Sequence, residues 1–181
     1  MNQVGDPPTG VEQAFVVASA LQGVRQYRPS SRISFAHLMC YLEGAESVNR
    51  DEIELALGSH LPLRRMFNDL LAKRAVATLA REARADDGSA IQTRQGEGFS
   101  VLFRESKASP DQVFVILKLA TDHTVPHGRE LLLVAQCDEA TISLKFPVPD
   151  DDRSQLILLD TDDRLHLLRN PDSALYLVPC S

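Results

Sequence analysis

The chain has 181 residues, of which 44% are hydrophobic and 24% are charged, and its formal net charge is -6. This length and composition are typical of a folded chain with one large or two small domains, and they exclude wholesale disorder. The negative charge, with no basic cluster longer than a pair, argues against direct nucleic-acid binding, because phosphate binding requires a concentrated basic surface.

The sequence also bears on where the protein works. It contains no run of about 18 apolar residues, so we expect no membrane-spanning helix. The first residues lack the basic segment and apolar block of a signal peptide. The cysteines, Cys40, Cys137 and Cys180, are odd in number and widely spaced, which fits a reducing compartment better than a disulfide framework. We therefore expect a cytoplasmic protein.

The first part of the chain, residues 1 to 85, has apolar residues at helical spacing and predicts a bundle of about four helices. The expected helices cover residues 10 to 26, 35 to 42, 50 to 57 and 60 to 84. Gly44 is placed to end the second helix, Asn49 to cap the third and Ser59 to cap the fourth. The apolar stripe of the fourth helix consists of Leu63, Met66, Phe67, Leu70, Leu71, Ala75 and Leu79.

A polar segment, residues 86 to 98, is the expected linker to a second domain over residues 99 to 181. The candidate strands there are "FSVLF", "QVFVILKLA", "ELLLVAQ", "ATISLKFPV", "SQLILLD", "RLHLLR" and "ALYLVP", with residues 161 to 163 at the tip of a hairpin. In "QVFVILKLA" both alternating sets of residues are mostly apolar, which predicts a central strand. The expected fold is therefore α+β, with an N-terminal helical bundle followed by an antiparallel β-sandwich or small barrel.

The residues that could hold a metal do not form a complete site. His37 and Cys40 are three residues apart and could share a helix face, and His60 lies further along, but no fourth ligand accompanies them. The acidic runs at residues 150 to 152 and 160 to 163 lack the ligand spacing of a calcium loop. We expect no metal and no cofactor.

Catalytic groups are equally sparse. Cys137 with His123 or His127 is the one thiol–base combination that the sequence allows, and no signature surrounds it. Glycine-rich phosphate loops are absent from the sequence. We expect no catalytic residue and no enzyme activity, with an enzyme or small-molecule sensor using Cys137 kept as the least favoured alternative.

The stretch "HLMCYLEGAESVNRDEIELALGSHLPLRRMF" resembles the anti-sigma domain of bacterial regulators that bind extracytoplasmic-function sigma factors. The likeness covers residues 33 to 84. It rests on a helix ending in Tyr-Leu-acidic-Gly at residues 41 to 44, on an acidic helix at residues 51 to 57, and on His60. In zinc-binding members this histidine opens an H-x-x-x-C-x-x-C motif, whose cysteine positions are occupied here by Arg64 and Phe67. The resemblance therefore implies a member without zinc, in which an apolar contact of Phe67 replaces the metal.

This resemblance implies a transcription regulator that sequesters a sigma factor through its helical domain, while the β domain senses a signal or a second partner. The side chains expected to bind the partner are Tyr41, Leu42, Leu63, Met66, Phe67, Leu70 and Leu71. Two questions stay open. The apolar stripe could belong to the core of the domain itself, and the protein could be a non-catalytic scaffold or accessory subunit of a larger assembly.

Overall fold

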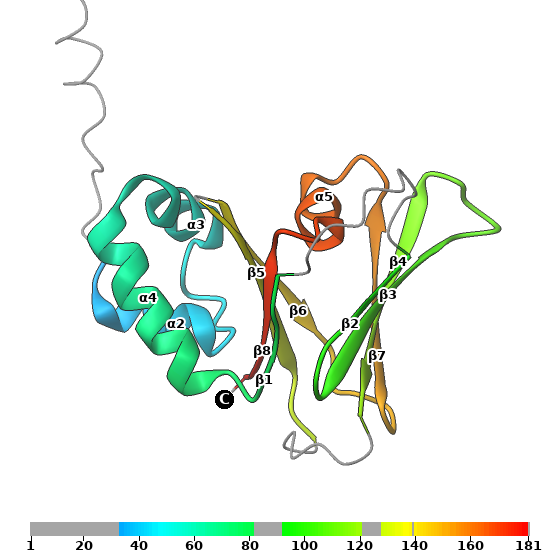
Figure 1. Cartoon of the computed structure of the whole chain (residues 1–181), viewed down its shortest axis with the longest axis horizontal. Helices are drawn as coiled ribbons and strands as arrows, with labels where there is room; N and C mark the ends of the chain where they lie inside the picture. Colours follow the sequence, from blue (N-terminus) through cyan, green and yellow to red (C-terminus); the bar gives the residue numbers. More distant parts are fainter. Residues whose placement is uncertain (1–32, 82–91, 121–127, 139, 181) are drawn as a thin grey trace, which may run out of the picture. The chain divides into compact units, whose positions relative to one another are not determined.

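The computed structural model describes residues 33–81, 92–120, 128–138 and 140–180, which belong to one compact unit, Ile33–Ser181. In this unit two antiparallel four-stranded sheets and four short helices follow one another in a mixed order along the chain (Figure 1). The predicted helix at residues 10 to 26 lies outside the described residues.

The helices are α2 (Phe35–Leu42), α3 (Arg50–Ser59), α4 (Leu61–Arg74) and α5 (Asp163–Arg169). The strands are β1 (Ala77–Leu79), β2 (Thr93–Gln95), β3 (Phe99–Glu105), β4 (Gln112–Leu119), β5 (Leu131–Cys137), β6 (Ala140–Phe146), β7 (Arg153–Leu159) and β8 (Ala174–Pro179). None of the described helices is both long and apolar enough to cross a membrane.

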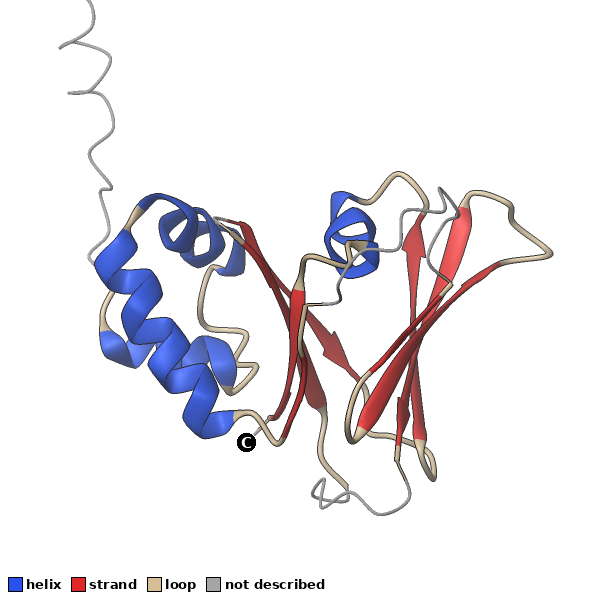
Figure 2. Ribbon diagram, in the orientation of Figure 1, coloured by secondary structure: helices blue, strands red, loops and turns tan. Residues whose placement is uncertain are grey.

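The two sheets have the strand orders β1-β8-β5-β6 and β2-β3-β4-β7 (Figure 2). In the first sheet Leu133 of β5 lies opposite Leu144 of β6 and Leu177 of β8. In the second sheet Val115 of β4 lies opposite Phe103 of β3 and Leu156 of β7. Every pairing is antiparallel, and the pairs β3–β4 and β5–β6 are formed by strands that follow each other directly in the chain.

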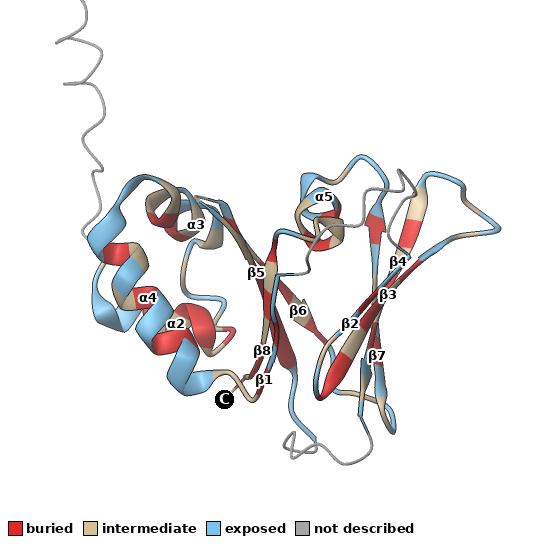
Figure 3. Ribbon diagram, in the orientation of Figure 1, coloured by how far each residue is buried: buried red, intermediate tan, exposed pale blue. Residues whose placement is uncertain are grey.

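Two apolar clusters hold the layers together. Side chains from the inner faces of both sheets, with Leu165 and Leu168 of α5, form the larger cluster. The outer face of the first sheet contributes Leu132, Val134 and Val178 to a second cluster, which it shares with α2, α3 and α4. The layers are therefore helices, first sheet and second sheet, and β5 is buried on both faces over Leu131 to Ala135 (Figure 3).

Local signals fix both ends of α2, of which Gly44 was predicted and the cap by Ser34 was not. Ser34 caps its start, because the hydroxyl of Ser34 accepts from the backbone N–H of His37 while the imidazole of His37 accepts from the N–H of Ser34. Gly44 follows its end with a φ of +73°, and Ala45 N–H donates to the carbonyl of Cys40. A glycine is required here, since it adopts the left-handed conformation without steric cost.

The predicted layout of a helical bundle followed by a β domain is wrong. Helix α5 lies between the strands β7 and β8, and the apolar faces of α2, α3 and α4 lie against the first sheet in addition to one another, so they form no separate bundle. The fourth helix ends at Arg74, not at residue 84, because Ala75 is extended and the N–H of Val76 donates to Leu177 on β8. Strand β1 then joins the first sheet beside β8.

The predicted strand "RLHLLR" and its hairpin are also wrong, because Asp163–Arg169 is the helix α5. Asp162 caps this helix by accepting from the N–H of Arg164. Its apolar residues recur at helical spacing, and Leu165 and Leu168 face the cluster between the sheets. The domain boundaries at residues 85 and 99 stay predictions, and part of the intervening linker lies outside the described residues.

Candidate protein interface

The histidines of the helical segment serve local structure. His37 belongs to the N-terminal cap of α2, and the imidazole of His60 accepts from the N–H of Leu63, 3.2 Å away, at the start of α4. His60 therefore has the capping role that we predicted for Ser59. Cys40 is half-buried. No group of three metal-ligating side chains comes together in the part of the chain that the structure describes.

The two positions where zinc-binding relatives would carry cysteines have structural roles. Arg64 donates from Nε to the carbonyl of Leu57 and from a terminal nitrogen to that of Gly58, at 2.9 and 2.7 Å, which satisfies carbonyls at the end of α3. Phe67 is completely buried. Its ring packs edge-to-face on that of Tyr41, with 5.7 Å between centroids.

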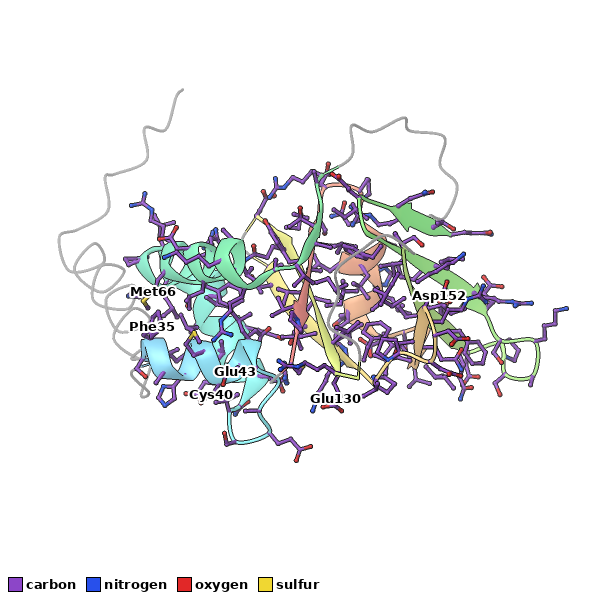
Figure 4. The ribbon with its side chains drawn as sticks, turned by 90° about the horizontal axis from the view of Figure 1, so that it is seen from below. Phe35, Cys40, Glu43, Met66, Glu130 and Asp152 are labelled. Atoms are coloured by element: carbon purple, nitrogen blue, oxygen red, sulfur yellow. The ribbon has the colours of Figure 1, made fainter. Side chains whose placement is uncertain are left out.

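The side chains that the sequence suggested for partner binding lie mostly inside the molecule. Those buried in the cluster between the helices and the first sheet are Tyr41, Leu42, Leu63, Phe67, Leu70 and Leu71. Met66 is half-buried, and Figure 4 shows it at the same end of the helical layer as Phe35, with Cys40 further along α2 and Glu43 just after its end. In this conformation the apolar stripe forms core, and a role in binding stays a prediction.

A partly buried polar cluster joins the helices to the first sheet. The Tyr41 hydroxyl donates to Glu54 Oε1 at 2.7 Å, and the Ser143 hydroxyl donates to the same oxygen at 3.0 Å. Arg50 donates to Ser143 Oγ at 2.8 Å, and its guanidinium lies 5.1 Å from the centre of the Tyr41 ring. Burial raises the pKa of Glu54, and burial raises that of Tyr41 well above its ordinary value. The cluster fixes the helical layer on β6.

The other two thiols, Cys180 and Cys137, have different surroundings among the described residues. Cys180 is buried, and burial raises the pKa of its thiol, which favours the unreactive form. Lys145 Nζ lies 2.7 Å from Glu130 Oε2, and this hydrogen bond raises the pKa of Lys145 (Figure 4 labels Glu130). Cys137 accepts from the amide of Asn170 at 3.5 Å. His123 and His127, its predicted partners, lie outside the described residues.

A cavity of about 280 Å³ lies at one end of β2, β3 and β4. It is lined by Gln95, Gly96, Phe99, Ser100, Lys118, Leu119 and Ala120. This lining contains no thiol, imidazole or carboxylate side chain, and its polar side chains are Gln95, Ser100 and Lys118.

The outer face of the second sheet carries an apolar band that no described element covers. Its members are Leu102 on β3, Phe114 and Ile116 on β4, and Ile157 and Leu159 on β7. Ile157 and Leu159 are each 53% exposed, and the other three are half-buried. The outer face of the first sheet, by contrast, is covered by helices.

The strand register makes this band continuous. Leu102 lies opposite Ile116, and Phe114 lies opposite Ile157. Leu159 is opposite Gln112 and diagonal to Phe114. Directly opposed side chains in an antiparallel sheet lie about 4.5–5.5 Å apart at Cβ, so the band crosses three neighbouring strands without a break.

The charges on this face are all positive. Arg104, Lys118 and Arg153 are exposed at its ends, and the outward positions of β2, β3, β4 and β7 contain no carboxylate. Arg153 lies 3.5 Å from Asp152, just before β7, in a pair open to solvent. On a chain of net charge -6, this face is locally basic. We call the apolar band together with these cations the outer face.

No family model matches the chain, and neither does any curated protein or solved structure.

The residues of the outer face were not predicted as a site, although the sequence contains a signal for them. Phe114 and Ile116 make both alternating sets of "QVFVILKLA" apolar, and Ile157 with Leu159 does the same for "SQLILLD". Such a strand is expected to be covered on both sides. The structure covers only one side of β4 with described residues, which identifies the outer face as the candidate interface.

Proposed function

We propose that this protein works by binding another protein on the outer face of its second sheet. The observation that carries the proposal is the continuous apolar band, since soluble proteins seldom leave such bands open unless something binds there. The absence of a metal-ligating group from the described residues favours binding over metal-dependent catalysis. A cytoplasmic location remains part of the proposal, on the grounds of the cysteine pattern.

The charge of the outer face defines the chemistry of the partner. An apolar band bordered by Arg104, Lys118 and Arg153 is complementary to an amphipathic helix with acidic residues beside its apolar stripe. Such a helix could lie across the sheet in the way that α2, α3 and α4 lie on the first sheet. The proposed occupant is therefore an acidic amphipathic helix of a partner protein.

An extracytoplasmic-function sigma factor is the partner that we propose to test first, because of the likeness in residues 33 to 84. The structure changes where we expect it to bind. The side chains first suggested for this role are mainly in the core, whereas the outer face is open. Sequestration of the sigma factor would then depend on the β sheet, and the helical layer would support that sheet.

The test is co-expression with a sigma factor encoded in the same operon, followed by a binding measurement on the purified proteins. Two variants have matched charge changes: Arg104→Glu with Lys118→Glu on the outer face, and Arg65→Glu with Lys73→Glu on the exposed side of α4. We expect the first variant to bind at least tenfold more weakly, about 1.4 kcal/mol, and the second to bind like the natural protein.

Equal binding by both variants would remove the outer face as the site. A natural protein that forms no complex with the sigma factor would remove the sigma-factor proposal. The alternative is a scaffold or accessory subunit, which is favoured by the same open face and does not depend on the likeness. Its expected result is a partner outside transcription whose binding is weakened by Arg104→Glu with Lys118→Glu.

A further inference from the structure

Strand β7 forms one edge of the second sheet, and among the described residues it pairs only with β4. The N–H of Leu119 donates to the carbonyl of Asp152, and the N–H of Asp160 donates to that of Asp111. Because such bonds recur at every second residue, the even-numbered residues of β7 direct their backbone groups toward β4. Those of Gln155, Ile157 and Leu159 are directed away from the sheet.

Part of this outward row is already bonded at its two ends. Arg153 exchanges backbone hydrogen bonds with Asp150, and the carbonyl of Leu159 accepts from the N–H of Asp162. The N–H and carbonyl groups of Gln155 and Ile157, with the N–H of Leu159, have no backbone partner among the described residues. An open row of this kind is a template for another strand.

The side chains along this edge lack the features that usually prevent an edge strand from pairing with a second strand. Proteins usually protect edge strands with charged residues, proline, bulges or short length. Residues 154 to 159, "SQLILL", contain neither a charge nor a proline, and β7 has 7 residues. The other edge strand of this sheet, β2, has only 3 residues.

We propose that two copies of this chain pair through β7 about a twofold axis at Ile157. In this register Ile157 of one copy lies opposite Ile157 of the other, and Gln155 lies opposite Leu159. Each open N–H then faces a carbonyl across the axis, since residues opposed in this way exchange both of their backbone hydrogen bonds. The two second sheets become one continuous sheet, and their outer faces join.

Charge favours the second copy as the occupant and fixes its direction. The uncharged segment is bordered by Arg153 at one end and by Asp160 at the other. Antiparallel pairing about Ile157 places Arg153 opposite Thr161 of the other copy, one residue from Asp160, so the oppositely charged ends of the two strands adjoin, and the symmetry repeats this arrangement. Parallel pairing would instead place like charges together, which costs stability.

The test uses the purified full-length chain alone, without a partner, so it is independent of the function proposed above. Sedimentation equilibrium should give twice the monomer mass of 20.0 kDa. Ile157→Lys and Ile157→Glu should each be monomeric, because each places two like charges opposite one another at the axis. An equimolar mixture of the two variants should form a mixed dimer, since the opposed charges then attract.

The matched control is Leu55→Lys, which introduces the same charge at an exposed leucine of α3 and should leave the dimer intact. Circular dichroism and thermal unfolding establish that each variant is folded. Amide hydrogen exchange adds a backbone measurement: the amides of Gln155 and Leu159 should be protected in the natural protein and exchange rapidly in Ile157→Lys. The amides of Leu156 and Leu158, which are directed toward β4, should stay protected in both.

Three results would overturn the proposal. One is a natural protein that sediments as a monomer at all concentrations. Another is a dimer that survives both charge changes at Ile157, which would place the contact elsewhere. The third is a pair of monomeric variants that do not associate when mixed, which would refute the twofold register. None of these results would affect binding of a partner to the outer face, which Arg104→Glu with Lys118→Glu tests separately.

Discussion

The hydroxyl of Tyr41 is the most informative single group to remove. In Tyr41→Phe the ring stays between Phe67 and Arg50, but Glu54 loses a donor 2.7 Å from its carboxylate. A hydrogen bond to a charged group contributes about 1.5–3 kcal/mol, and one between neutral groups about 0.5–1.5 kcal/mol. We therefore expect a loss of about 1.5–3 kcal/mol in the free energy of unfolding at pH 7.

The loss should depend on pH in a defined direction. Burial raises the pKa of Glu54, and the hydrogen bonds from Tyr41 and Ser143 partly oppose this. The folded protein therefore binds the proton of Glu54 more tightly than the unfolded chain does. This group favours folding below its ordinary pKa, and stability declines as the pH rises through the folded pKa. Without the Tyr41 hydroxyl the folded pKa rises further, so the decline becomes larger.

The assay is urea unfolding of both proteins at several pH values, followed by circular dichroism. Comparing the variant with the natural protein cancels the titration of other carboxylates. The cost of Tyr41→Phe should be about 0.5–1.5 kcal/mol at low pH, where Glu54 is protonated in both states, and about 1.5–3 kcal/mol at neutral pH. Combining it with Glu54→Gln should remove most of the pH dependence.

The control is Tyr176→Phe, the same chemical change at a half-buried tyrosine of β8 whose hydroxyl makes no hydrogen bond with the described residues. Its expected cost is below about 0.5 kcal/mol at every pH. The reasoning would be refuted if Tyr41→Phe cost no more than this control, or if its cost were the same at low and neutral pH.

Three further substitutions test the local structure by the same unfolding measurement. Gly44→Ala should cost about 1–2 kcal/mol for the left-handed backbone, plus a steric part because the new Cβ would lie 2.7 Å from Cys180 Sγ. Adding Cys180→Ala to Gly44→Ala should reduce only the steric part of this cost. If the double variant instead loses the sum of the two separate losses, the contact between the new Cβ and Cys180 Sγ is contradicted. His60→Ala should cost about 0.5–2 kcal/mol by removing the cap of α4, and an unchanged midpoint would contradict it. Phe67→Ala should cost about 3–5 kcal/mol, and a loss below about 1 kcal/mol would contradict its complete burial.

The parts of the fold that depend on neighbouring residues could be predicted from the sequence. Gly44 ends α2 because the left-handed conformation there is available to glycine, and Asn49 caps α3 by accepting from the N–H of Glu52. Strand β6 could be predicted because Ile142, Leu144 and Phe146 alternate with polar residues. Such signals arise within a few residues and need no knowledge of the rest of the chain.

The elements that were mispredicted depend on contacts far along the chain. The short apolar run "RLHLLR" is compatible with a strand or a helix, and α5 forms because Asp162 caps it and Leu165 with Leu168 faces the space between the sheets. Helix α4 ends at Arg74 because β8, about a hundred residues later, provides a backbone partner for Val76. Neither choice can be made from a local window.

The outer face of the second sheet could not be predicted from local sequence either, and it is the feature on which the proposed function depends. From the sequence, the alternating apolar residues of β4 indicate only that something covers each side of the strand. One side packs on the first sheet, through Val113, Val115 and Leu117. The other side, with Phe114 and Ile116, has no cover among the described residues, and cations surround it where a core would exclude them. A sequence pattern that first indicated the interior of a sandwich therefore belongs, once the layers are known, to an apolar surface that the described residues leave open, and the proposed interface is based on this surface.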